Sequence, residues 1–313
     1  MVIDEVVSKL GEGDSPSAVQ VGQLSGLAPG ESSAFFAEWA KLPAERRRAV
    51  LRVALQLAED SVEMDFGTVF KACLSDSDPN VRATAIEGLW EDEEFRTADR
   101  LAKMLRNDAD EGVRVAAALS LARFALLGEI GSLYKSAAER VHAALFAAAT
   151  DQTESVEVRR RAIEAVGVLE DSDVEALLEA SYRDDNPKMR ASAVYAMGRS
   201  GDERWLPTIL KEMESDEPEF RFEAARAAGQ LDSPRVVVPL INLLKDDDLE
   251  VQLAAIGALG EVGGDLARKA LLQCIRGNDS ALREAAKEAL TQLDLDSDPL
   301  TTSPFLDDST RTI

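Results

Sequence analysis

Only a few residues of the chain have the types and spacing that catalysis requires. The single histidine is His142, so a site that needs two histidines, such as the HExxH zinc site, cannot form. The two cysteines, Cys73 and Cys274, lie far apart within apolar helical patterns, which predicts reduced, buried thiols. The sequence contains neither a phosphate-binding glycine loop nor a nucleophile-elbow motif. We therefore expect a protein that is not an enzyme and that holds no metal or cofactor.

Two further groups could take part in chemistry, and each has a structural interpretation. His142 occurs in the helical pattern AAERVHAALF, where a half-buried structural histidine is favoured over a general base. Neighbouring carboxylates occur in the runs EDEEF (91–95) and DDDLE (246–250). In so acidic a chain, such runs are typical of solvated loops and helix caps rather than of acid–base pairs.

The overall charge limits the classes of partner. The 313 residues include 58 acidic and 35 basic side chains, which gives a net charge of −23. Such a chain repels nucleic-acid phosphates and anionic membranes at long range. The sequence also has no apolar run of about 18 residues and does not start with a signal peptide. We expect a cytoplasmic protein with protein partners, and neither nucleic acid nor membrane among them.

One basic residue recurs at a fixed spacing along the chain. The related positions are Arg82, Arg114, Arg159, Arg190, Arg221, Gln252 and Arg283. The steps between them are 32, 45, 31, 31, 31 and 31 residues. Four equal steps in succession indicate an internal repeat, and the step of 45 predicts an insertion near residues 126–142.

Each copy of the repeat has the pattern of one helix. Short polar residues that can cap a helix precede the apolar positions, and proline stands at the first helical position in Pro79, Pro187 and Pro218. Apolar or small residues then recur on one face of a 3.6-residue period. Glycine follows near the end of several copies, and we expect it to close those helices: Gly167, Gly198, Gly229 and Gly260.

A second helical segment separates these copies, for example ERWLPTILKEME from residue 203. Two antiparallel helices per unit cannot bury their apolar faces alone, so stacked units must share one core. The predicted fold is all-α, an α-solenoid of stacked helix pairs. We assign residues 1–31 to an N-terminal cap or linker, 32–293 to the solenoid and 294–313 to a disordered acidic tail.

The repeated units resemble HEAT repeats through the pattern D-x-(D/N)-P-x-(V/M)-R-x-x-A-x-x-A-(L/M)-G. The short step is most similar to the phycobilisome-lyase type. The resemblance implies an internal ladder in which a loop aspartate pairs with each arginine, and the matching residues are Asp76 with Arg82, Asp108 with Arg114, and Asp184 with Arg190. Whether an arginine takes its acid from its own repeat or from the next stays open, and an arginine row that binds a polyanion is the alternative. Deoxyhypusine hydroxylases built on HEAT-like repeats carry paired His-Glu motifs, which this chain lacks.

The resemblance also implies that the second helices line a concave face. Helix geometry directs three positions of each copy away from the core, and a solvated face should carry charges there. Several copies carry apolar or aromatic residues there instead, and this favours a partner-binding strip. The alternative is that these side chains pack between neighbouring helices. The candidates are Trp90, Val115, Leu119, Tyr195, Phe222, Arg226 and Leu253.

We therefore predict an interaction scaffold or adaptor without enzymatic activity. Two alternatives remain: a tetrapyrrole lyase or chromophore-handling chaperone, which the resemblance implies, and a structural or regulatory subunit of a larger complex. In the tail, the segment SPFLDD with Ser303 is either a docking motif or a passive solubilising end.

Overall fold

The computed structural model describes residues 3–13, 15–231 and 233–296, and the tail beyond 296, with its SPFLDD segment, lies outside them. These residues form 18 α-helices and three short 3-10 helices, with no strand among them, which confirms the all-α class. The chain divides into two compact units, unit 1 (Met1–Leu169) and unit 2 (Glu170–Ile313). In the described ranges, every helix is too short or too polar to cross a membrane.

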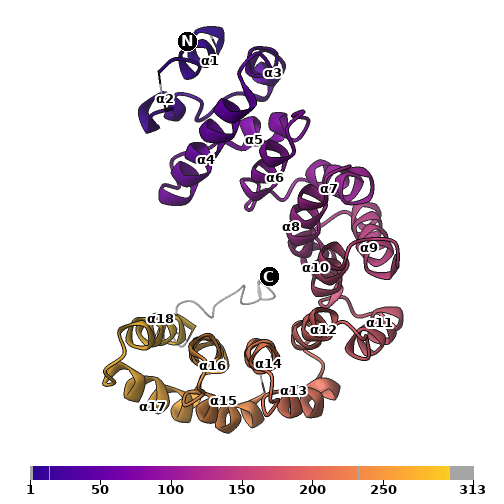
Figure 1. Ribbon diagram of the computed structural model, residues 1–313, viewed down its shortest axis with the longest axis vertical. Coiled ribbons are helices and arrows are strands. Elements are labelled where there is room, and N and C mark those ends of the chain that lie inside the picture. Colours follow the sequence, from indigo (N-terminus) through magenta and orange to yellow (C-terminus); the bar gives the residue numbers. More distant parts are fainter. Residues whose placement is uncertain (1–2, 14, 232, 297–313) are drawn as a thin grey trace, which may run out of the picture. The chain divides into compact units, whose positions relative to one another are not determined.

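Unit 1 contains five helix pairs (Figure 1). In order they are α1 (Ile3–Leu10) and α2 (Ala18–Gly22), α3 (Ser32–Trp39) and α4 (Ala44–Asp60), α5 (Gly67–Cys73) and α6 (Pro79–Glu87), α7 (Phe95–Asn107) and α8 (Glu111–Glu129), and α9 (Lys135–Thr150) and α10 (Val156–Val166). The 3-10 helix η1 (Pro29–Glu31) precedes α3. From α3 onward, the first helices pack in one layer and the second helices α4, α6, α8 and α10 in the other.

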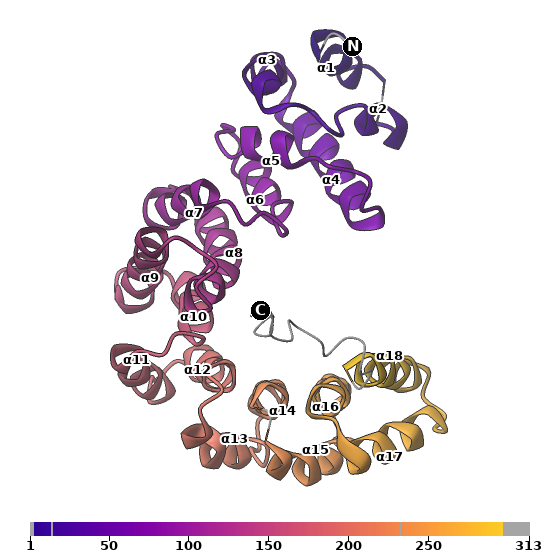
Figure 2. The same cartoon turned by 180° about the vertical axis from the view of Figure 1, so that it is seen from behind.

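Unit 2 contains four helix pairs. They are α11 (Ser172–Tyr182) and α12 (Pro187–Arg199), α13 (Leu206–Glu212) and α14 (Pro218–Gln230), α15 (Val237–Leu243) and α16 (Leu249–Val262), and α17 (Gly264–Ile275) and α18 (Ser280–Asp296). The 3-10 helices η2 (Glu203–Trp205) and η3 (Pro234–Val236) lead into α13 and α15. Figures 1 and 2 show α12, α14, α16 and α18 side by side in a second-helix layer, with the first helices on its other side. Each pair is therefore one unit of an α-solenoid.

Local sequence explains where the second helices begin. Side chains of Asp78, Asp110 and Ser155 accept hydrogen bonds from backbone amides of the first turn, as does Asp248. Such caps satisfy amides that have no partner inside the helix. Glu217 makes no side-chain cap, but Pro218 at the first helical position needs no amide partner.

The step of 45 residues arises from longer helices. Helix α8 has 19 residues and α9 has 16, whereas α12 and α11 have 13 and 11. The two long helices meet at a turn around Gly131, which has a positive φ of 75°. The extra residues therefore extend one helical hairpin and add no new element.

Three of the four glycines expected to close helices have another role. Gly198, Gly229 and Gly260 are buried inside α12, α14 and α16, and only Gly167 caps its helix. A Cβ on Gly198 would stand 2.3 Å from the Cα of Ala227. Gly229 faces Ala258 and Gly260 faces Ala289 in the same way. Glycine is required here because adjacent second helices approach too closely for any side chain.

Candidate functional site

Five of the repeated arginines attach their second helix to the loop that precedes it, whereas Arg159 Nε donates to the carbonyl oxygen of Ala149 in α9. The Nη1 atoms of these five arginines donate to two backbone carbonyl oxygens of the preceding loop. Arg82 Nη1 lies 2.8 Å from the carbonyl oxygen of Asp76, and Arg221 Nη1 lies 2.8 Å from that of Ser215. Arg114, Arg190 and Arg283 make the equivalent bonds. The fixed offset in the sequence therefore reflects a bond to the main chain of the same repeat.

The other edge of the guanidinium reaches the following repeat, which settles a question that the sequence left open. Arg82 donates to both carboxylate oxygens of Asp108, at 2.9 and 2.6 Å. Arg221 binds Asp246 at 2.7 and 2.8 Å in the same bidentate geometry. The hydrogen bond to Arg221 is the main cause that lowers the pKa of Asp246. A loop aspartate therefore accepts its arginine from the preceding pair, while its own arginine binds its backbone.

Arg114 and Arg190 have other partners in the following repeat. Arg114 binds Glu154 at 2.8 and 2.9 Å, so the residue after Thr153 supplies the missing carboxylate. Arg190 faces the following loop where Ser215 replaces aspartate, and its guanidinium carbon lies 5.3 Å from the ring centre of Phe220. A cation–π contact thus takes the place of the ion pair. These contacts support a structural role for the arginine row.

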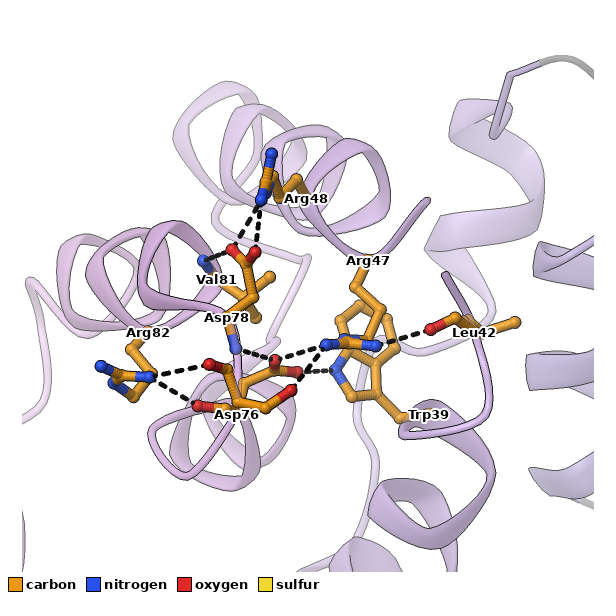
Figure 3. A network of polar contacts seen from close by, with 9 residues as sticks. Trp39, Leu42, Arg47, Arg48, Asp76, Asp78, Val81 and Arg82 are labelled. Carbon is orange, nitrogen blue, oxygen red and sulfur yellow. Dashed lines mark hydrogen bonds and ion pairs between the residues drawn. The ribbon is translucent and has the colours of Figure 1, made fainter. Parts of the chain in front are cut away.

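A buried network extends the ladder toward the N-terminus, and the sequence reading missed it (Figure 3). The carboxylate of Asp76, which is 3% exposed, accepts from Trp39 Nε1 at 2.7 Å and from Arg47 Nη2 at 2.9 Å. Arg47 Nη1 also donates to the carbonyl oxygen of Leu42. Arg47 thus plays the part of Arg82 one pair earlier. The run of Arg46, Arg47 and Arg48 gave no indication of which arginine faces the core.

The neighbouring pair is nearer to solvent. Arg48 Nε donates to Asp78 Oδ1 at 2.9 Å, and the same carboxylate caps α6 through the amide of Val81. The hydrogen bond from Arg48 is the main cause that lowers the pKa of Asp78. Figure 3 shows both aspartates of one short loop, each bound by an arginine of α4.

Three of the predicted partner-binding residues lie together in unit 2. The guanidinium carbon of Arg226 lies 4.1 Å from the ring centre of Tyr195 and 5.5 Å from that of Phe222. Arg226 Nη1 donates to Glu223 Oε2 at 2.9 Å, yet the side chain keeps 40% of its surface exposed. Arg226 thus contacts two rings and one carboxylate, which leaves its side chain little rotamer freedom.

Glu261 completes the surroundings of Arg226. Its carboxylate lies against the backbone of Gly229, only 2.3 Å from where a Cβ of that glycine would stand. Partial burial raises the pKa of Glu261, and the positive charge of Arg226 offsets part of this shift. Helix α14 and its neighbour α16 thus place two glutamates beside one arginine.

The same helical position forms a row across unit 2, which we call the exposed row. Its members come from α12, α14, α16 and α18 at steps of 31 residues: Tyr195, Arg226, Gly257 and Glu288. Tyr195 is half-buried, whereas Gly257 and Glu288 are exposed. A Cβ on Gly257 would meet nothing within 4 Å, so the row is open at this position. Leu253 lies half-buried one turn earlier on α16.

The remaining candidates belong to unit 1 and do not share one site. Trp90, 52% exposed, follows the end of α6 and lines a small pocket with Val62 and Glu59. Leu119 is 48% exposed on α8, and Val115 on the same helix is half-buried. They therefore form no part of the cluster in unit 2.

The histidine and the two cysteines each lie within a helix. His142 is half-buried in α9 and meets Phe146 edge-on, with ring centres 6.0 Å apart. Both cysteines are free thiols, but only Cys73 is buried as expected, whereas Cys274 is half-buried. Burial raises the pKa of both thiols. In the part of the chain that the structure describes, no group of three or more His, Cys, Asp or Glu could hold a metal ion.

Two solved structures with similar folds cover most of the chain. The complex of CpcE and CpcF of phycocyanin lyase from Nostoc sp. PCC7120 is 18% identical, with a TM-score of 0.51 over 86% of this chain and 94% of that one. Yeast importin-beta (Kap95p) is 14% identical, with a TM-score of 0.52 over 96% of this chain. This chain spans 47% of the importin-beta chain, about half its length. At these identities the likeness shows the fold alone.

A third, weaker likeness is to human deoxyhypusine hydroxylase, with 18% identity and a TM-score of 0.37 over 85% of this chain and 96% of that one. No curated protein sequence matches the chain. A family model described as HEAT repeats matches residues 68–151, 142–211 and 206–291, which together span α5 to α18. The chain belongs to the HEAT-repeat family.

Proposed function

We propose that the chain is a non-enzymatic scaffold or adaptor that binds a protein partner through the second-helix layer of unit 2. The observation that carries this proposal is the stack of Arg226 between Tyr195 and Phe222. Arginine and tyrosine are enriched at binding hot spots, where they combine apolar contact with directed hydrogen bonds. Unlike Arg221 one turn earlier, Arg226 has no backbone carbonyl to hold, so the ladder does not explain its presence.

Gly257 supports the same proposal. It is exposed and leaves an open position next to Arg226 along the exposed row, whereas a neighbouring helix packs against the buried glycines Gly198, Gly229 and Gly260. An opening beside an anchored arginine fits a partner side chain that enters between α14 and α18. Glu288, on the far side of the opening, fits a partner base there.

The experiment compares partner capture by the full chain and by variants of unit 2. Tagged wild type, Tyr195→Ala, Phe222→Ala and Arg226→Ala are used for quantitative affinity purification, with Val238→Ala as the matched control. Val238 is 57% exposed in unit 2 but lies on α15 in the first-helix layer. We expect wild type and Val238→Ala to capture a stoichiometric amount of partner. Each of Tyr195→Ala, Phe222→Ala and Arg226→Ala should capture about tenfold less. Equal capture by all four variants contradicts the proposal.

The tetrapyrrole alternative makes a different prediction from the same residues. A bilin is a conjugated open-chain tetrapyrrole that carries carboxylates, and Tyr195 with Arg226 offers it one ring and one cation. Titration of a free bilin into the full chain should then change its visible absorption spectrum, and Arg226→Ala should remove that change. An unchanged spectrum with wild type counts against this alternative and leaves the scaffold proposal in place. A structural subunit of a larger complex is distinguished by co-purification that all variants of the stack retain.

A further inference from the structure

The lengthened hairpin of α8 and α9 exposes apolar side chains that the core does not use. Tyr134 is 72% exposed and Ile130 is 64% exposed, both at the turn between the helices. Leu126, one turn earlier on α8, is 42% exposed. Clustered apolar residues at a surface cost solubility, and they commonly mark an interaction site. Insertions into solenoid repeats also map to loops that often form the binding face.

The tip of the hairpin meets the loop that leads into α7. The rings of Phe95 and Tyr134 are edge to face, with centres 5.3 Å apart. Beside them lies a pocket of about 390 Å³, formed with Leu133 and Gly131 of the turn. Its only charged lining residues among those described are Glu93 and Glu94. Lys71 holds Glu94 in place at 2.6 Å, from outside the pocket.

An aromatic wall beside two carboxylates suits one kind of side chain. The aliphatic stem of a lysine or arginine packs against rings while its charge reaches the acids. Phe95 already has such a neighbour, since the guanidinium carbon of Arg96 lies 5.7 Å from its ring centre. Glu91 and Glu129 add exposed negative charge next to the pocket and at the end of α8. A second copy of this chain is a poor occupant because each copy carries a charge of −23.

We propose that this pocket binds a basic side chain of a protein partner, followed in the partner by an apolar residue. The basic side chain lies against Phe95 and Tyr134 and pairs with Glu93 and Glu94. Ile130 and Leu126 contact the apolar neighbour. This pocket, together with Ile130 and Leu126, belongs to unit 1, and its role does not depend on the exposed row of unit 2.

A direct test uses a short fluorescein-labelled peptide that alternates arginine with leucine, and a matched peptide in which glutamate replaces each arginine. Fluorescence anisotropy measures the binding of each peptide to the full chain. We expect the basic peptide to bind more tightly than the acidic one, and Tyr134→Ala and Glu93→Lys to weaken it about tenfold. Tyr134 is mostly exposed, so its variant should keep the melting temperature of wild type.

The control separates this pocket from general attraction to an acidic protein. Glu219→Lys makes the same change of charge at an exposed position of α14 in unit 2. Glu219→Lys should weaken peptide binding by less than about twofold, because Glu219 does not line the pocket and salt screens an exposed charge. A photo-crosslinking version of the basic peptide should attach to the turn 130–135. Equal effects of Glu93→Lys and Glu219→Lys, crosslinks spread over the chain, or no preference for the basic peptide overturn the proposal.

Discussion

Within each of the two units, neighbouring helices are held together by a different kind of contact. In unit 2, Gly198, Gly229 and Gly260 each meet an alanine of the next helix, and the same contact recurs every 31 residues. In unit 1, the joint between α3, α4 and α5–α6 depends on the buried carboxylate of Asp76. The ring of Phe70 lies against Gly88, the nearest counterpart of the glycines in unit 2.

The difference shows what keeps a repeat regular. A glycine against an alanine fixes both the distance and the register of two helices, so a change in repeat length would separate the pair. Long side chains such as Arg47 and Arg114 can reach partners at varied offsets. Accordingly, the steps between the ladder arginines of unit 1 vary, at 35, 32 and 45 residues from Arg47 to Arg159.

The largest effect should come from removing the buried carboxylate of unit 1. In Asp76→Ala, Arg47 keeps its charge with 7% of its side chain exposed, and Trp39 Nε1 loses its acceptor. We expect a loss of about 3–5 kcal/mol, because an unpaired buried charge is left behind. Hydrogen exchange measured by mass spectrometry should show faster exchange in α3 to α6 and little change in unit 2.

The exposed Asp60 at the end of α4 provides the control, since Asp60→Ala should change stability by no more than about 0.5 kcal/mol. Replacing both partners by apolar residues, as Asp76→Leu with Arg47→Met, should recover part of the loss. If the double variant is as unstable as Asp76→Ala, the shape of the site outweighs its charge.

The second prediction breaks the close contact of unit 2. In Gly198→Ala, the new methyl group would stand 2.3 Å from the Cα of Ala227, so the two helices must separate. We expect a loss of about 1–3 kcal/mol in urea unfolding, typical of overpacking. Gly257→Ala is the matched control in the same layer, because its Cβ meets nothing within 4 Å. It should gain about 0.5–1 kcal/mol from helix propensity. Similar losses for both variants would refute the packing role of Gly198.

The third and smallest effect concerns pH and the rung between Arg221 and Asp246. The pKa of Asp246 is lowered in the folded protein, mainly by its hydrogen bond to Arg221. Its ion pair therefore stabilises the fold above the ordinary aspartate pKa of about 3.9, and this contribution is lost as the pH falls through the lower folded pKa. Asp246→Asn should cost about 1–2 kcal/mol near neutral pH and less at about pH 3.

Urea unfolding at both pH values measures the loss of unfolding free energy in Asp246→Asn. The control is Asp247→Asn at the exposed neighbouring position, which should show no such loss. If the difference in unfolding free energy between wild type and Asp246→Asn stays constant down to about pH 3, the charge of Asp246 contributes nothing to stability.

The fold could be predicted because several local signals agree on it. The step of 31, the capping residues and the prolines at the first helical positions all specify the same helices. The role of Gly198 could not be predicted, because a glycine near a helix end looks the same whether it caps the helix or admits a neighbour. The acid partner of Arg82 was equally ambiguous, since Asp76 and Asp108 both lie within reach of a long side chain.

The candidate site was predictable only in outline. Tyr195 and Arg226 share one position of the repeat, which places them on adjacent helices. Their stacking depends on side-chain rotamers, which a repeat pattern does not specify. Arg47 was missed because three arginines stand together, and helix phase alone decides which of them faces the core.

The exposed row has one consequence for how any partner must lie. Its four positions run from an aromatic ring through a cation and an opening to an anion: Tyr195, Arg226, Gly257 and Glu288. No two of the four residues are chemically alike, so the order of residue types along the row has a direction. A partner that places an acid opposite Arg226 and a base opposite Glu288 loses both pairings when it is reversed. A row built from nearly identical helix pairs thus has a direction, and a molecule bound along it would lie in one orientation only.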